Sequence, residues 1–171
     1  KINVGVLGAS QALVLMTLIK KENGVDLNLI PYKGGGPVNQ DILAGVTDVA
    51  IQSLTSVSPH ITSKKVRPIA VTGEQRTPAL PDTSTLIEQK VKSFPSYAWW
   101  GIYAPAGASS ELVTRLNEAL NRVLAMADVK ERLAVQGMEP QAGSAAEFAA
   151  YVKKEVDMWA RIVKTVGITV D

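Results

Sequence analysis

The stretch INVGVLGASQALVLMTLIKKENGVDLNLIP, residues 2–31, decides the fold. An apolar run over residues 2–7 ends at a glycine, helix formers follow from Gln11 to Lys21, and a second apolar run spans Val25 to Pro31. Between the last two, Asn23-Gly24 is a common helix-stop signal. Strand, helix and strand at these spacings predict a parallel βαβ unit with a right-handed crossover.

Elements of the same kind continue this alternation toward residue 98. Residues 32–37 contain three consecutive glycines, which are costly inside an element, so a loop is expected there. We then expect a short helix over 38–43 ended by Gly45, a buried strand over 47–53, a short helix from Ser58 to about Lys64, a strand over 67–72, a short helix over 83–90 and an extended aromatic segment over 97–103.

Helical patterns dominate the rest of the chain. Ser109 or Ser110 is expected to cap a helix that runs through about Met126. Asp128 caps a shorter helix to Gln136, stopped by Gly137, and Ser144 with Glu147 forms a capping box that opens a last helix over 145–166. The change near residue 98 is therefore the best domain boundary, with an α/β part before it and a helical part after it.

Composition excludes several function classes. The 171 residues carry a net charge of +2 with no basic patch, which argues against a nucleic-acid partner. No run approaches the ~18 apolar residues of a membrane span. The absence of cysteine removes disulfides and thiolate zinc sites, and the single histidine, His60, argues against a histidine metal site or a Ser-His-Asp triad. We expect no enzyme, no cofactor and no metal.

The first candidate ligand loop comprises Gly8, Ala9, Ser10 and Gln11. It joins a strand to a helix, and ligands of open parallel sheets bind outside the carboxyl ends of the strands. Backbone N–H groups and the positive end of the following helix favour an anionic group there. The alternative is structural: Gly8 makes the turn and Ser10 caps the helix.

Two further features are candidates for binding. The strand end at Gln52 and the hydroxyls of Ser53 and Thr55 could hydrogen-bond a ligand, or form an ordinary helix cap and turn. In Trp99-Trp100, alternation places the two side chains on opposite sides of an extended segment, so one faces a cleft or an interface. His60 and Lys33 are interpreted as structural residues. The glycines at 34–36 lack the Gly-Lys-Ser/Thr order of a phosphate-binding P-loop.

Several ordered motifs resemble one family. Residues 31–35, Pro-Tyr-Lys-Gly-Gly, resemble the signature of the Bug family, the periplasmic solute receptors of tripartite tricarboxylate transporters. Residues 45–49 resemble its Gly-Gln-Val-Asp segment, Pro59-His60-Ile61 its Pro-His-Ile, and Trp100 to Gly107 its Trp-x-Gly-x-x-Ala-Pro-Ala-Gly. The resemblance covers essentially the whole chain, which opens inside a strand without a secretory signal; either that signal was removed or the chain begins inside a longer protein.

The resemblance implies a type II periplasmic binding protein-like α/β fold, with one parallel-sheet lobe plus part of the other lobe. Residues 1–98 would form the second, central lobe. Residues 99–171 would supply the crossing strand and C-terminal helices of the first lobe, whose N-terminal part is missing here. The implied function is capture of a small organic carboxylate in the periplasm for a membrane permease.

The resemblance also assigns roles to residues. Gly8 to Gln11 would hold the carboxylate, while Gln52, Ser53 or Thr55 would contact its other polar atoms, with Trp100 as a further ligand contact. Gln52 stands where the family usually has an acid, so a plain carboxylic acid is expected rather than an amino acid. Two other classes stay open: a nucleotide-binding flavodoxin-like module that uses the glycines at 34–36, and an interaction or oligomerising protein.

Overall fold

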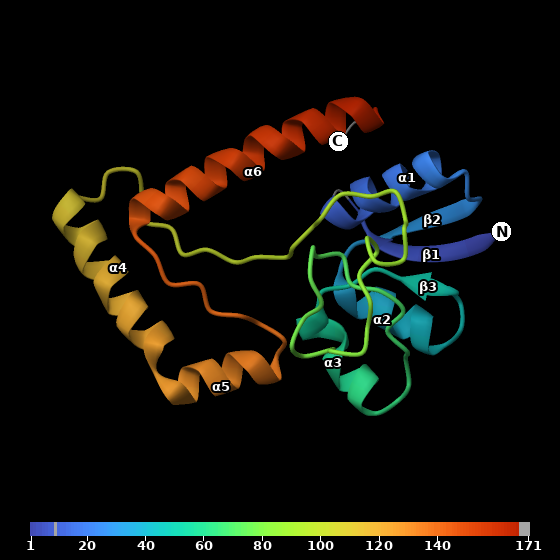
Figure 1. The fold of residues 1–171 in the computed structure, drawn as a ribbon, viewed down its shortest axis with the longest axis horizontal. Coiled ribbons are helices and arrows are strands. Elements are labelled where there is room, and N and C mark those ends of the chain that lie inside the picture. Colours follow the sequence, from blue (N-terminus) through green and yellow to red (C-terminus); the bar gives the residue numbers. More distant parts are fainter. Residues whose placement is uncertain (9, 168–171) are drawn as a thin grey trace. The chain divides into compact units, whose positions relative to one another are not determined.

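The computed structural model describes residues 1–8 and 10–167, which divide into two compact units. Unit 1 comprises Lys1–Ala98 with the described residues from Val163 onward, and unit 2 is Trp99–Ile162. Unit 1 contains β1 (Ile2–Leu7), α1 (Gln11–Asn23), β2 (Leu27–Tyr32), α2 (Gly35–Leu43), β3 (Val49–Ala50) and α3 (Leu54–Thr62); α4 (Ser110–Ala125) and α5 (Ala127–Val135) lie in unit 2, and α6 (Ala145–Val166) begins there (Figure 1).

The centre of unit 1 is a parallel sheet with strand order β2-β1-β3. Ile2 pairs with Leu27 and Leu7 with Tyr32, so β1 and β2 are in register along their full length. The predicted α/β class and the parallel βαβ unit are confirmed. β3 is shorter than the expected strand over 47–53, although Asp48 N–H and Ile51 N–H also donate to carbonyls of β1 at 2.9 and 3.1 Å.

Helices cover both faces of this sheet. Val4 and Val6 share one face because alternate residues of a strand point the same way, and both are buried beneath α1. Gly5 faces the other side, where the buried Val38 of α2 approaches it. α1 ends at Gly24, whose φ of 62° places it in the left-handed region that the stop signal predicted.

Two helices begin earlier than the sequence indicated. α2 starts at Gly35, so two of the three glycines lie in its first turn, where N–H groups have no intrahelical partner and Pro37 is tolerated. α3 starts at Leu54 rather than Ser58, because the extended backbone at Ser53 turns directly into the helix. Pro59 therefore lies inside α3, where it removes only one intrahelical hydrogen bond.

The expected strand over 67–72 and the expected helix over 83–90 do not form. Within the described residues this region has one parallel bridge, between Val71 and Thr85. Pro68 cannot donate to a ladder, and the Gln89 side chain donates to the Ile69 carbonyl at 2.7 Å, where a neighbouring strand would have paired. Lys90 has a φ of 59°, in the left-handed region, so the turns after Thr85 cannot continue as a helix beyond this residue.

The helix caps of the C-terminal region follow the sequence closely. Ser109 Oγ accepts the Leu112 N–H at 3.2 Å at the start of α4. Ser144 and Glu147 form the predicted capping box, with bonds of 2.7 Å and 3.2 Å between each backbone N–H and the opposite side chain. α5 differs slightly, because Met126 rather than Asp128 is its N-cap residue.

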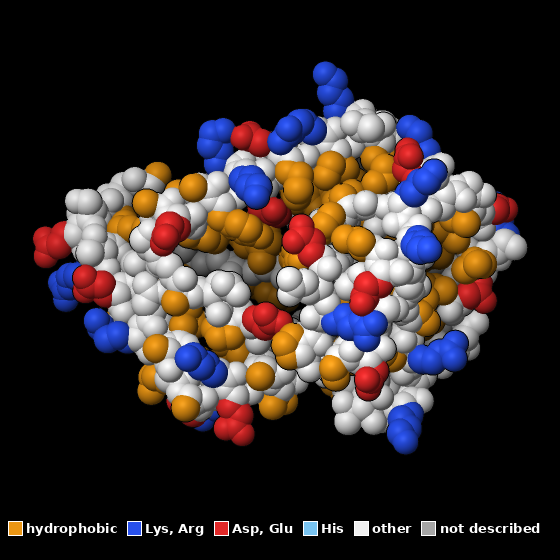
Figure 2. All heavy atoms as spheres, viewed as in Figure 1, with side chains coloured by type: hydrophobic (Ala, Val, Ile, Leu, Met, Phe, Trp, Pro, Cys, Tyr) orange, Lys and Arg blue, Asp and Glu red, His pale blue; other side chains and the backbone are white. Residues whose placement is uncertain are grey.

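Unit 2 has a sparse core. None of residues 99–162, all of which the structure describes, is fully buried. Leu112 and Leu116, which lie four residues apart on α4, are each 46% exposed. Figure 2 shows apolar side chains at the surface over α4 and α5. In the described part of the chain, no helix is long and apolar enough to cross a membrane.

Candidate functional site

Three helices begin at one edge of the sheet. β1, β2 and β3 are parallel, so their carboxyl ends lie together, and each is followed within a few residues by the first turn of α1, α2 or α3 (Figure 1). Most backbone N–H groups of a first turn have no partner within their own helix, and they carry the positive end of the helix dipole. In α3 the Ser56 N–H is an exception, because it donates to the Ser53 carbonyl at 3.0 Å. This edge therefore favours an anionic ligand.

The N-termini of these three helices lack side-chain caps. Ser10 precedes α1, but its hydroxyl donates back to the Leu7 carbonyl at 2.6 Å. Gly34 precedes α2 and has no side chain to offer, and Ser53 makes no capping bond to α3. By contrast, Ser109 and Ser144 cap α4 and α6. Capping serines are thus used in this chain, but not where the sheet ends.

Gln52, Ser53 and Thr55 lie together in a half-buried polar network. The hydroxyls of Ser53 and Thr55 are 3.0 Å apart. Ser56 joins them, with its Oγ 3.3 Å from Ser53 Oγ and 3.3 Å from Gln52 Oε1. Gln52 Nε2 also donates to the Gly35 carbonyl at 3.2 Å. Sequence reasoning missed Ser56 and Gly35; a serine three residues after Ser53 was the available signal.

The described residues of the first loop, Gly8, Ser10 and Gln11, lie between the end of β1 and the start of α1. Gly8 N–H donates to the Tyr32 carbonyl at 3.0 Å, which ties the end of β1 to the end of β2. Ser10 and Gln11 follow at the start of α1. Ala9 lies outside the described residues. The structure thus brings Gly8, Ser10 and Gln11 to the same sheet edge as the polar network.

The tyrosine of the Pro-Tyr-Lys-Gly-Gly motif has a structural role. Tyr32 Oη donates to Asp41 Oδ2 of α2 at 2.6 Å. This hydrogen bond, with smaller contributions from partial burial and the aspartate charge, raises the pKa of Tyr32 above its usual value of 10.0. The bond fastens α2 to the end of β2. Lys33, the next residue, is exposed.

The tryptophan pair divides as alternation predicts. Trp99 packs edge-on against Tyr151, with ring centroids 5.4 Å apart, and its indole N–H donates to Glu155 at 3.1 Å. Trp100 is 64% exposed. It belongs to unit 2, and its role as a ligand contact stays a prediction.

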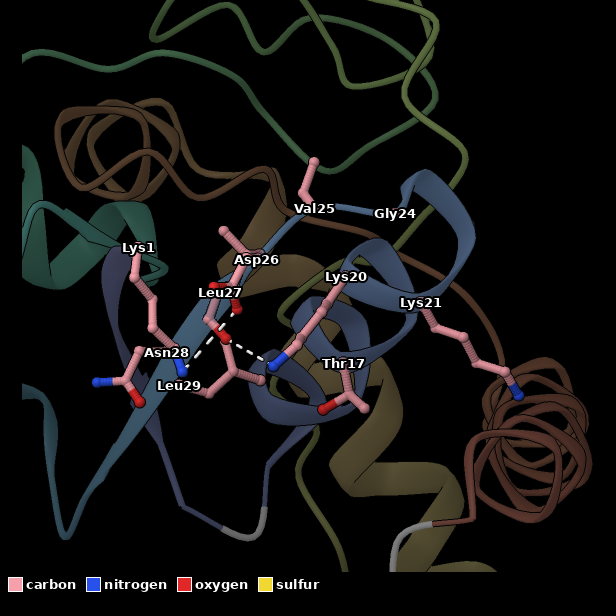
Figure 3. Close-up of a pocket in the computed structure, with 10 residues that line it drawn as sticks. All are labelled: Lys1, Thr17, Lys20, Lys21, Gly24, Val25, Asp26, Leu27, Asn28 and Leu29. Atoms are coloured by element: carbon pink, nitrogen blue, oxygen red, sulfur yellow. Dashed lines mark hydrogen bonds and ion pairs between the residues drawn. The ribbon is translucent and has the colours of Figure 1, made fainter.

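A surface pocket lies at the opposite end of β2, and its chemistry differs from that of the sheet edge (Figure 3). Lys20 Nζ donates to the Leu27 carbonyl at 2.8 Å, and Lys1 pairs with Asp26 at 3.9 Å. The pocket also adjoins the last turn of α1, the negative end of that helix dipole. It is a poorer anion site than the sheet edge. Across residues 1–8 and 10–167, no cluster of acidic, histidine or cysteine side chains could hold a metal ion.

Comparison with known proteins gives a consistent result. A family model described as "Tripartite tricarboxylate transporter family receptor" matches residues 1–168. Protein BugT of Bordetella pertussis is 31% identical over 158 residues, which cover 92% of this chain and 48% of that protein. The chain therefore spans about half the length of the curated relatives it matches.

Solved structures agree over nearly all of the chain. An R. palustris protein with adipate is 29% identical with a TM-score of 0.88, and the match covers 99% of this chain and 57% of that one. MatC from Rhodopseudomonas palustris with bound malate is 28% identical with a TM-score of 0.79, covering 95% and 56%. Periplasmic binding protein BugD is 33% identical with a TM-score of 0.79, covering 98% and 57%.

Proposed function

Because the chain belongs to the tripartite tricarboxylate transporter receptor family, we propose that it forms part of a receptor that captures a small organic carboxylate. Members of this family are binding proteins of transporters, not enzymes. The observation that carries the proposal is the meeting of three helix N-termini without side-chain caps at one sheet edge. A carboxylate is the kind of group that such N–H donors hold.

The proposed ligand contacts follow from this geometry. Backbone N–H groups from Gly8 to Gln11, including Ala9, and those of the first turns of α2 and α3 hold one carboxylate. The hydroxyls of Ser53 and Thr55 contact the remaining polar atoms, with Gln52 beside them. The family resemblance, rather than this geometry, suggests Trp100 as a further ligand contact. The adipate and malate of the two solved relatives support a dicarboxylate as the ligand class.

The proposal extends to the location and the partner. BugD is described as a periplasmic binding protein, which supports a periplasmic location for this chain. The family description supports a membrane permease as the partner that receives the solute. The nucleotide alternative is not favoured, because the glycines at 34–36 lack the order of a phosphate-binding P-loop and the matching family model describes a transporter receptor.

The proposed organisation has two lobes. Residues 1–98 form one lobe, and residues 99–171 contribute to another, whose remaining part corresponds to the half of the relatives that this chain does not match. The sparse core of unit 2 supports this organisation. Ligand capture then proceeds by closure of the lobes, which the ligand favours because it binds the closed form more tightly.

Titration of the 171-residue chain, followed by the backbone amide signals in nuclear magnetic resonance, tests the proposal. Adipate and malate are expected to shift the amides at the starts of α1, α2 and α3, with affinity on the order of millimolar because half the contacts are absent. Glutamate should bind less well, since its ammonium group meets no carboxylate partner. Dicarboxylates that leave those amides unmoved would contradict the site, and micromolar binding would contradict the two-lobe organisation.

A further inference from the structure

Gln52 lies at a junction between two helices. It lies two residues after the end of β3 and immediately before Ser53, the N-cap residue of α3. Its Nε2 donates to the carbonyl of Gly35, the first residue of α2, at 3.2 Å. Its Oε1 lies 3.3 Å from Ser56 Oγ, in the first turn of α3. One amide group therefore joins the first turns of α2 and α3.

The partners of Gln52 are themselves held in place. Ser56 Oγ is 3.0 Å from the Ser53 carbonyl, and the Ser56 carbonyl accepts a hydrogen bond from Asn39 Nδ2 of α2 at 3.0 Å. The amide also packs close to Gly35, since a Cβ added there would lie 3.5 Å from Gln52 Oε1. The amide is half-buried and makes bonds within the protein through both its donor and its acceptor atom.

We propose that Gln52 is a positioning residue, which fixes the first turns of α2 and α3 relative to each other so that their N–H groups converge on one carboxylate. This inference rests on the proposed function and refines it, because Gln52 then acts through the helices. A glutamine suits this role, since its planar amide can donate to a carbonyl through nitrogen and accept from a hydroxyl through oxygen, whatever the pH. A carboxylate at the same place could not donate to Gly35, and it would repel the bound anion.

A double-mutant cycle on adipate binding tests the proposal in the 171-residue chain. Gln52→Met removes both hydrogen bonds at similar volume, and Ser56→Ala removes the partner on α3. Each change is expected to weaken adipate binding about five- to tenfold, and the double variant should bind no more weakly than Gln52→Met alone. Additive losses would instead mean that Gln52 contacts the ligand directly, and they would overturn the positioning role.

A matched control is available in the same unit. Gln89 also uses its amide for two hydrogen bonds, to the Ile69 carbonyl at 2.7 Å and to Ser84 Oγ at 2.8 Å. Gln89→Met should lower the thermal midpoint about as much as Gln52→Met, while adipate binding stays unchanged. If Gln89→Met and Gln52→Met weakened adipate binding equally, the effect would be one of general stability and the proposal would fail.

A measurement without ligand separates this proposal from the proposed function. In Gln52→Met, amides of the second turns of both α2 and α3 should exchange with deuterium several-fold faster, whereas Gln89→Met leaves them unchanged. Faster exchange in only one of the two helices would overturn the coupling, whatever the ligand result. A wild-type chain that gives no amide shifts with adipate or malate would contradict the proposed function alone.

Discussion

Gly5 shows how one residue without a side chain determines the packing of α2 on the sheet. A Cβ at this position would lie 3.1 Å from Val38 Cγ1 and 3.4 Å from Tyr32 Cε2. Val38 is completely buried, so its side chain cannot move away from an added Cβ without displacing its own neighbours. Close packing in protein interiors makes such an added group costly, because neighbouring side chains must leave their preferred rotamers.

Gly5→Val is therefore expected to lower the free energy of unfolding by about 2–3 kcal/mol. Equilibrium denaturation in urea measures this loss. Gly36→Ala is the matched control, because a Cβ there meets nothing within 4 Å and the residue lies in the first turn of α2. The control should be neutral or slightly stabilising. Equal losses in the two variants would contradict the packing argument.

Glu147 gives a residue-scale prediction of pH dependence. The Ser144 backbone N–H and, to a lesser degree, the Ser144 hydroxyl hold the pKa of this carboxyl below its usual value of 4.5. A carboxyl with a lowered folded-state pKa stabilises the fold above its unfolded pKa, and this contribution is lost as the pH falls through the folded pKa. The start of α6 should therefore weaken in acid.

The comparison with Glu147→Gln isolates this effect, since glutamine also completes a capping box but does not titrate. The wild-type chain should be more stable than the variant above about pH 4.5, and the difference should shrink as the pH falls below that value. Thermal unfolding followed by circular dichroism across this range measures the difference. A difference that does not change with pH would show that the capping carboxylate adds nothing beyond a neutral hydrogen bond.

At the scale of elements, one carboxylate joins α6 to the segment that precedes α4. Glu155 Oε2 accepts the indole N–H of Trp99 at 3.1 Å and that of Trp159 at 3.3 Å. The Trp99 ring also packs edge-on against Phe148 and Tyr151. Because none of residues 99–162 is fully buried, we expect these interactions to contribute strongly to the stability of unit 2.

Glu155→Leu should therefore destabilise unit 2 by about 1–3 kcal/mol, because two half-buried indole donors lose their acceptor. Lys154→Leu, on an exposed position of α6, is the control and should have little effect. Tryptophan fluorescence during denaturant unfolding reports on Trp99 and Trp159, with a contribution from Trp100 that is common to all variants. An unchanged unfolding midpoint in Glu155→Leu would mean that aromatic packing alone holds the segment.

The elements that were predicted correctly are those with local signals. Helix caps at Ser109 and Ser144 and the stop at Gly24 depend on nearby residues, and their bonds form as expected. The expected strand over 67–72 fails because strand formation depends on a partner elsewhere in the chain, and the Gln89 side chain takes that place at Ile69. The apolar residues of 67–72 indicated a strand, but they carried no information on whether a partner strand would be available.

At the scale of the whole molecule, the sequence indicated the sheet edge where the candidate site lies, but it did not predict the hydrogen bonds within that site. Parallel strands bring their carboxyl ends to one edge, so Gly8, Ser10 and Gln52 were expected to lie near each other. The bonds from Gln52 to Gly35 and Ser56 depend on where α2 and α3 begin, and both helices begin earlier than the sequence indicated. A shift of four residues in α3 decides which hydroxyl faces the amide.

The exposed apolar surface of unit 2 leads to a prediction for the chain as a whole. Val156 is 61% exposed, Ile102 is 71% exposed and Val135 is 75% exposed, in addition to the half-exposed leucines of α4. Apolar surfaces of this kind promote association and bind hydrophobic dyes. The isolated 171-residue chain should therefore associate at micromolar to millimolar concentration, as measured by sedimentation.

Replacing Leu112 and Leu116 by glutamine should weaken this association and lower the binding of a hydrophobic dye. The two leucines lie four residues apart, so they share one face of α4, and both are half-exposed. A matched pair of changes at two exposed polar positions of the same helix, Arg115→Gln with Glu118→Gln, should leave association unchanged. If the wild-type chain sediments at 18.2 kDa at every concentration and binds no dye, the exposed apolar side chains do not form an association surface. That result would remove one of the two observations that support the proposed two-lobe organisation.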